Sequence, residues 1–451
     1  MRVKVLSIGL LGATWALGLV LPHFQPDPNF FELMLDSVVV LTLAYSLWFV
    51  LDNAFLSSLK VSYGLTAFYV VLFLLSYLLL KLGSPTLYDL WSHLGSGSME
   101  YEGSLFPFGD LVHFTAAAGC VTGIEIGVNS CDPWQRAFNQ NPDISRFLDL
   151  IRLANVDLLG VGSYVFLTLL LILIIRERNL GSIAFIIFIA SPPFVLAIDR
   201  GNEIITIFFI LLGLVFLESS NKYCKPFAVV FLFAGAIFKL WPILLIAFLT
   251  LFASKSKRRY LLIAFVLSAG YWLSSANKIT KMLSATQDGS PHGMAFGLKL
   301  FFSDQTSLIN VGYLVALTIL IAAIWINYFG RSLTASFKSP IPDHRYTILI
   351  PTLLTYVGIW IFSDSFIYRM LILLPALLIL ISQDLLSRAW VKGSVVLILV
   401  TVLSSRLAIT TAISSSLALV FLFVSFMYAW ARILNHISQR QVSKEGLAES
   451  R

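Results

Sequence analysis

The chain has 451 residues, of which 58% are hydrophobic and 12% charged, with a formal charge of +7 and a mean hydropathy of +0.86. Soluble domains carry about 25% charged residues, so this composition excludes a soluble globular protein. The apolar runs are continuous and do not alternate with a period of two, which excludes a membrane β-barrel. The sequence therefore predicts an all-α, polytopic transmembrane protein, in which helices satisfy every backbone group inside the hydrocarbon.

Apolar segments close to the length of about 20 residues that crosses a bilayer follow one another along the chain. We predict about fourteen spans, near residues 5–22, 35–54, 63–82, 154–175, 180–198, 204–219, 226–239, 241–253, 260–274, 308–328, 346–362, 370–382, 392–404 and 411–431. The first run lacks a small-residue cleavage site and is predicted to be a retained span. Pro242 favours a break, so the segment 226–253 forms either two crossings or one re-entrant hairpin.

The distribution of Lys and Arg predicts the orientation. With the N-terminus in the cytoplasm, about two-thirds of the 31 Lys and Arg residues fall in cytoplasmic segments, as the positive-inside rule requires. Both termini are then cytoplasmic. The net charge follows from this bias, and no basic patch interleaved with aromatic residues predicts nucleic-acid binding. We divide the chain into an N-terminal hairpin (1–60), a transmembrane core (61–390) with a long outer loop (83–152), a C-terminal hairpin (391–431) and a cytoplasmic tail (432–451), which we expect to be disordered.

Charged and polar residues recur on the predicted outer side, although positive charge avoids that side. They lie in the long loop, in a second loop at about 275–307, and in three short turns between spans. A charge at the centre of a membrane helix costs about 2.5–3.5 kcal/mol, so charges beside apolar segments indicate a function. The candidate site residues are Asp110, His113, Arg200, Asn202, Glu203, Lys239, His292 and Arg369.

Two interpretations are open for five of these residues. Asp110 is a helix N-cap, a general base whose pKa is raised by partial desolvation, or both. Arg200 is a cation at a helix end whose charge reaches water, or a phosphate ligand whose guanidinium matches phosphate oxygens. The same alternatives apply to Lys239 and Arg369, and His292 is either a solvated loop residue or part of the site. Taken together, the residues suit a substrate with a phosphate head and a lipid tail.

The cysteines add little to the prediction. Cys120 and Cys131 share the long outer loop, where a disulfide remains an open alternative, and Cys224 would face the cytoplasm. Their spacing matches no metal-binding pattern. We therefore predict neither a metal nor a cofactor.

Five short segments share their content and their order with a known family. They are residues 109–113, 131–139, 200–203, 239–242 and 368–376. In this order, on the outer side, they resemble multi-spanning glycosyltransferases of the GT-C type, most of all the family-87 group, which includes polyprenyl-phosphate-mannose-dependent mannosyltransferases. The resemblance covers about residues 80–390.

The resemblance implies a base at Asp110, a polyprenyl-phosphate-sugar donor that enters from the outer leaflet, and phosphate contacts at Arg200, Lys239 and Arg369. The sequence departs from the family in carrying Glu203 where similar proteins often have Asp. It also lacks the usual paired acidic residues beside the base, which argues against a metal-dependent variant.

The leading hypothesis is inverting transfer of a hexose such as mannose to a lipid or glycan acceptor, on the outer face of a prokaryotic cytoplasmic membrane. A lipid-linked-sugar flippase or other transporter is the alternative, because it would use the same cations without a base. A scaffold subunit of a cell-envelope assembly is a third hypothesis, in which the charged turns are assembly contacts. The clustering of polar residues on one side favours the enzyme over the transporter.

Overall fold

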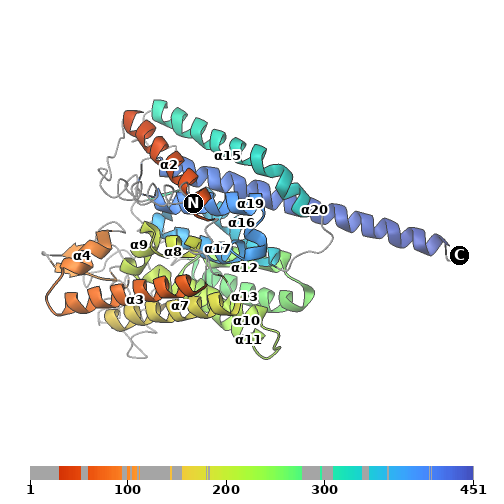
Figure 1. The fold of residues 1–451 in the computed structure, drawn as a ribbon. Coiled ribbons are helices and arrows are strands. Elements are labelled where there is room, and N and C mark those ends of the chain that lie inside the picture. The colour runs from red at the N-terminus through yellow and green to blue at the C-terminus, as the bar shows by residue number, and fades with distance from the viewer. Residues whose placement is uncertain are drawn as a thin grey trace.

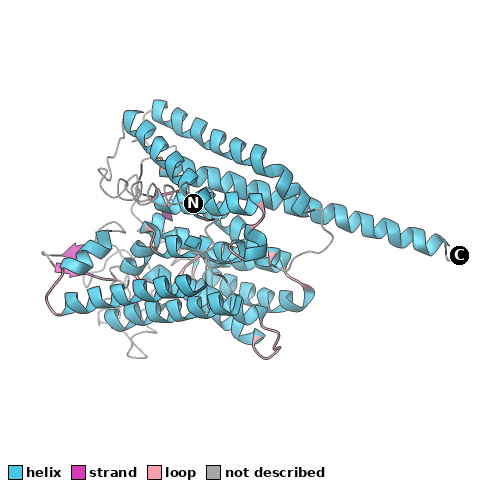
Figure 2. Ribbon diagram, in the orientation of Figure 1, coloured by secondary structure: helices cyan, strands magenta, loops and turns pink. Residues whose placement is uncertain are grey.

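The computed structural model describes residues 30–51, 59–93, 99–101, 104–108, 111, 143–144, 155–178, 180, 183–276, 295–296, 308–337, 345–362, 365–405, 407 and 409–449. Helices dominate this part of the chain (Figure 2), as the composition predicts. The strands form two short antiparallel pairs: β1 (Met99–Tyr101) with β2 (Ser104–Phe106), and β3 (Ala295–Phe296) with β4 (Ser365–Phe366). The prediction of an all-α fold is therefore confirmed.

One group of helices is drawn from residues 59–274. It comprises α3 (Leu59–Lys81), α4 (Thr86–His93), α7 (Val156–Arg178), α10 (Asn202–Glu218), α11 (Lys225–Phe238) and α13 (Lys255–Ser274). In Figure 1, α3, α7 and α10 run side by side, and α4 packs at one end of α3. The indole of Trp272 donates a hydrogen bond to the carbonyl of Ala236 at 2.7 Å, which joins α13 to α11.

The chain bends between α8 (Ile183–Ile189) and α9 (Pro192–Arg200). We predicted a single span at 180–198, whereas these two helices meet at 46°. The cause is local, because Pro192 and Pro193 have no N–H to continue the hydrogen bonds of α8, and both suit the start of a new helix. The Ser191 hydroxyl occupies the break and donates to the Phe188 carbonyl at 2.6 Å.

A second break, near Pro242, lies where the sequence predicted it. Helix α11 ends at Phe238, Lys239 adopts an extended conformation, and α12 (Trp241–Phe252) begins one residue before Pro242. Helix α12 then packs against α13 and against α16 (Tyr346–Phe362).

The second group of helices surrounds a buried one. It comprises α2 (Phe30–Val50), α15 (Leu308–Phe337), α19 (Ala389–Leu403) and α20 (Thr410–Glu449). Residues 390–402 of α19 are all buried, because α2, α15 and α20 pack around this helix. Between α16 and α19 along the chain lie η2 (Ile367–Leu373), α17 (Leu374–Leu380) and α18 (Gln383–Leu386). Of these, η2 packs against α9, and α17 packs against α16 and α19.

The C-terminal tail differs from the prediction. We expected residues after Ala431 to be disordered, but α20 continues to Glu449 and extends well beyond the rest of the molecule (Figure 1). No proline follows the apolar part of α20, and residues such as Arg, Gln, Lys and Glu favour helices. Nothing in the sequence therefore stops the helix where the apolar segment ends.

Within the residues that the structure describes, five helices are long and apolar enough to cross a membrane, or six if α8 and α9 form one bent span. They are Leu33–Val50, Tyr63–Lys81, Val156–Glu177, Ile309–Phe337 and Thr410–Asn435. The other apolar helices have only 10–17 residues, so each is shorter than the roughly 30 Å of hydrocarbon that a single straight helix must cross. The count of fourteen spans and the placement of the termini stay predictions.

Exposed apolar residues lie on one face of the long helices. In α3, Phe68, Val71, Leu75 and Leu78 are 46–65% exposed, and their spacing places them on the same side. The opposite side buries Phe73 completely. Such a continuous apolar face is typical of a helix in contact with lipid.

Candidate functional site

The predicted outer turn at residues 200–203 forms the junction of α9 and α10. Gly201 joins the two helices with a φ of +81°, and its N–H donates to the Ala197 carbonyl at 2.8 Å. Glycine is suited to this left-handed conformation because it has no side chain to clash. Arg200, the last residue of α9, is half-buried. Asp199 and Glu203, on either side of the junction, are 1% and 0% exposed.

Asp199 accepts a hydrogen bond from the phenol of Tyr88 at 2.8 Å. Tyr88 is completely buried in α4, so this bond ties the segment that we predicted as the long outer loop to the end of α9. Burial, and after it the negative charge of Asp199, raises the pKa of the Tyr88 phenol well above its usual value. The phenol is therefore protonated at neutral pH and acts as the donor.

Glu203 accepts a hydrogen bond from the indole nitrogen of Trp241 at 2.8 Å. Trp241 is the first residue of α12, so this bond joins the predicted turn at 239–242 to the junction of α9 and α10. Lys239, two residues earlier, is half-buried at the end of α11, and its N–H donates to the Gly235 carbonyl. We predicted Glu203 as a substrate ligand, and the structure gives one of its oxygens a role in holding α12.

Arg369 lies in η2, which packs against α9, α10 and α16. The residues just before η2 form β4, and β4 pairs with β3, with Ala295 opposite Phe366 and Phe296 opposite Ser365. The structure thus brings residues 295–296, from the predicted second outer loop, to the segment that carries Arg369. Arg369 itself is half-buried.

The residues on either side of the predicted base are firmly packed. Phe108 and Leu111 are 0% and 1% exposed, and the Leu111 N–H donates to the Phe108 carbonyl at 2.8 Å. A Cβ on Gly201 would lie 2.8 Å from the Leu111 side chain, and a Cβ on Gly160 in α7 would overlap the ring of Phe108. Leu111, the residue after Asp110, therefore rests on the turn that carries Arg200.

An aromatic cluster supports Phe108 and Tyr88 together. Its members are Phe73 and Tyr77 of α3, Tyr88 and Trp91 of α4, Phe108, and Tyr164 of α7. The closest pair, Phe73 and Tyr164, has ring centroids 4.4 Å apart in an edge-to-face arrangement, which is a favourable geometry for aromatic rings. The cluster therefore joins the Asp199 contact to the segment that leads to Asp110.

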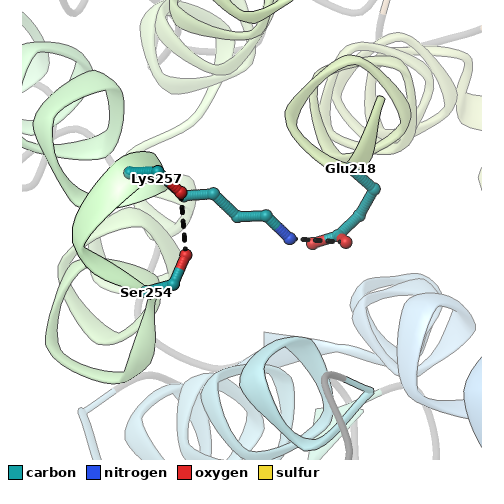
Figure 3. A network of polar contacts seen from close by, with 4 residues as sticks. Glu218, Ser254 and Lys257 are labelled. Carbon is teal, nitrogen blue, oxygen red and sulfur yellow. Dashed lines mark hydrogen bonds and ion pairs between the residues drawn. The ribbon is translucent and has the colours of Figure 1, made fainter. Parts of the chain in front are cut away.

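The structure also locates other charges that the sequence drew attention to. Asp157, a polar residue within a predicted span, lies at the start of α7 and forms an ion pair with Lys81 of α3 at 2.8 Å. At the far end of α10, Glu218 accepts a 2.6 Å bond from the Lys257 ammonium (Figure 3). The Lys257 N–H donates to the Ser254 carbonyl. Helix α10 therefore carries a buried or half-buried carboxylate near each end.

Several predicted residues lie outside the described part of the chain. They are Asp110, His113, His292, Cys120 and Cys131. Asn202 is the first residue of α10, and its side chain lies outside the described part of the chain. Within the described residues, no group of three or more His, Cys, Asp and Glu side chains could hold a metal ion.

The sequence analysis missed three residues of this region: Tyr88, Asp199 and Trp241. Trp241 lies inside the segment 239–242 and Asp199 directly precedes the segment 200–203, yet neither was assigned a role. Their partners are 111 and 38 residues away along the chain, and no local spacing reveals such a pairing. The only sequence feature that could have identified Asp199 is that this acidic residue directly precedes Arg200.

The site is therefore the junction of α9 and α10, which carries Arg200 and the buried carboxylates of Asp199 and Glu203. The segments that carry Lys239 and Arg369 pack beside this junction. A guanidinium that is half-buried among packed segments suits the binding of an anionic group. The chain matches no protein-family model, no curated protein and no solved structure.

Proposed function

We propose that the protein is an integral-membrane glycosyltransferase that moves a hexose from a polyprenyl-phosphate-sugar donor to an acceptor on the extracytoplasmic face of the membrane. The observation that carries the proposal is the packing around Arg200. Leu111, which follows Asp110, packs on Gly201, and Trp241 at the start of α12 donates to Glu203. The segment η2, which carries Arg369, packs against α9 and α10. Segments far apart in sequence thus meet at the junction of α9 and α10, where Arg200 lies.

In the proposed reaction, Asp110 removes the proton of an acceptor hydroxyl. The hydroxyl oxygen bonds to the anomeric carbon of the sugar, and the bond between that carbon and the phosphate oxygen breaks. The leaving phosphate gains negative charge, which Arg200, Lys239 and Arg369 stabilise. Fixed cations contribute most where burial excludes water, and Arg200 and Arg369 are both half-buried.

The test uses the full-length protein in liposomes with radiolabelled polyprenyl-phosphate-mannose and a lipid extract as the source of acceptor. We expect Asp110→Asn to lower transfer by about 10²–10⁴-fold, the usual contribution of a general base. The matched control is Asp157→Asn, which removes another outer carboxylate whose partner is Lys81. We expect this control to keep most of the activity.

Unchanged transfer in Asp110→Asn would contradict the assignment of the base. The same liposomes distinguish the transporter hypothesis. Movement of the labelled lipid between leaflets without formation of a new glycoside, and with equal rates for the two variants, would favour a flippase over an enzyme.

A further inference from the structure

Two ionisable side chains are buried on either side of Arg200. Asp199 precedes it at 1% exposure, and Glu203 follows three residues later at 0% exposure. A buried carboxylate is costly unless hydrogen bonds or charges compensate it. Here Tyr88 supplies one donor and Trp241 the other, both at 2.8 Å. The donors come from α4 and α12, so each carboxylate joins the junction to a different segment.

These two bonds fix the rotation of both helices at the junction. Consecutive residues of an α-helix point about 100° apart, so Asp199 and Arg200 cannot face the same way. With Asp199 held inward by Tyr88, the direction in which Arg200 leaves the last turn of α9 is set. Glu203, the second residue of α10, is held by Trp241 in the same manner.

Gly201 makes such a double restraint necessary. Its φ of +81° places a tight turn between the two helices, and glycine is the residue with the greatest conformational freedom. Leu111 closes the space over this glycine. Without contacts on both sides, rotation about the backbone of Gly201 would swing the Arg200 end of α9 relative to α10.

The donors are themselves held in place. Tyr88 belongs to the aromatic cluster, with its ring centroid 5.5 Å from that of Trp91. The raised pKa of its phenol keeps the donor proton in place at neutral pH. Trp241 begins α12, which packs against α13 and α16.

We propose that Tyr88 and Asp199, together with Trp241 and Glu203, are positioning residues that orient Arg200 toward the phosphate of a polyprenyl-phosphate ligand. The class of ligand rests on the proposed function. In this proposal Glu203 holds α12 against the junction by accepting the hydrogen bond of Trp241. This role replaces the substrate contact that the sequence predicted.

The experiment measures binding of polyprenyl phosphate without sugar to the full-length protein in nanodiscs, with the uncharged polyprenol as the control lipid. The variants are Tyr88→Phe and Trp241→Phe, which remove one donor each and keep most of the packing. Two controls remove donors of the same kind from buried positions elsewhere: Tyr356→Phe loses a bond to the Ser414 carbonyl, and Trp360→Phe loses a bond to the Ser415 hydroxyl.

We expect Tyr88→Phe and Trp241→Phe to weaken binding of polyprenyl phosphate by about 5- to 30-fold, the factor that corresponds to the loss of one or two kcal/mol. Binding of polyprenol should not change, and the two controls should bind as the wild type does. Thermal unfolding of all four variants identifies any loss of the fold.

A double-mutant cycle separates positioning from general stability. In an Arg200→Ala background, Tyr88→Phe should have no further effect on binding, because the residue that it positions is gone. Equal effects in the two backgrounds, equal effects of Tyr88→Phe and Tyr356→Phe, or no binding by the wild type would each overturn the proposal.

The binding experiment and the sugar-transfer experiment can fail independently. If the wild type binds polyprenyl phosphate in the expected pattern but transfers no sugar, the glycosyltransferase assignment fails and the positioning role stands. If sugar transfer depends on Asp110 while Tyr88→Phe binds normally, the positioning role fails and the enzyme assignment stands.

Discussion

The ring of Phe108 lies directly over Gly160 and leaves no room for a β-carbon on that glycine. Phe108 is fully buried and has a φ of 62°, an uncommon conformation for a residue other than glycine. Leu111, three residues later, is seated on Gly201. A glycine of α7 and the glycine between α9 and α10 therefore contact the segment that contains the predicted base.

We expect Gly160→Ala to destabilise the protein by about 1–3 kcal/mol, the usual effect of overpacking a buried site. Gly162 is the matched control, because it lies in the same helix and a Cβ there meets nothing within 4 Å. Gly162→Ala should be neutral or slightly stabilising, since alanine favours helices more than glycine does. Thermal unfolding in detergent measures both, and equal melting temperatures would show that Phe108 is not confined by Gly160.

Gly201→Ala should lower the free energy of unfolding more than the replacement of another glycine that has the same backbone conformation. Gly83 has a φ of +85° but open space around it, so Gly83→Ala carries only the backbone penalty of about 1–2 kcal/mol. At Gly201 the contact with Leu111 adds to this penalty. The measurement is again thermal unfolding. Leu111→Ala in the Gly201→Ala background should recover part of the loss, and a loss that is simply additive would contradict the contact.

The two ion pairs at the ends of helices should differ in strength. Lys257 and Glu218 are 19% and 14% exposed, whereas Lys81 and Asp157 are 45% and 46% exposed. A double-mutant cycle with Glu218→Gln and Lys257→Met should give a coupling of about 1.5–3 kcal/mol, as for hydrogen bonds to charged groups. The corresponding cycle for the exposed pair should give less than about 1 kcal/mol. The reverse order would show that burial does not decide their strength.

The predicted orientation places the two ends of α10 on opposite sides of the membrane. Cys224, which is free and partly accessible, follows α10 and should face the cytoplasm. In a protein with Cys120 and Cys131 replaced by serine, a membrane-impermeant maleimide should label Cys224 only in inverted vesicles. A cysteine introduced at Gly83 should be labelled only in intact cells. Labelling of both from the same side would show that the orientation is wrong.

Patterns along the chain predicted most helices but not how they meet. Pro242 correctly predicted the break between α11 and α12. The pair Pro192 and Pro193 carried the same signal, yet the apolar residues around it led us to expect one straight span where the chain bends by 46°. Hydropathy reports the solvent of a segment, and it does not report the angle between two halves of that segment.

The candidate site was predictable in its charges and not in its contacts. Arg200, Lys239 and Arg369 stood out because a cation beside an apolar segment is costly. Tyr88 did not, because a tyrosine in a short amphipathic helix is common, and its pairing with Asp199 spans 111 positions. Such pairings depend on the packing of α4 against α9, which no period or spacing encodes.

The junction at Gly201 places opposite helix ends beside each other. Helix α9 presents its carbonyl end, with a partial negative charge, and α10 presents its amide end, with a partial positive charge. Arg200 lies in the last turn of α9 and Glu203 in the first turn of α10, so each side chain has the sign that its helix dipole favours. Exchanging the two residues would set both charges against the dipoles, at a cost of about 0.3–1 kcal/mol each. The order of arginine before glutamate is thus favoured by the backbone itself, whether or not a ligand is bound.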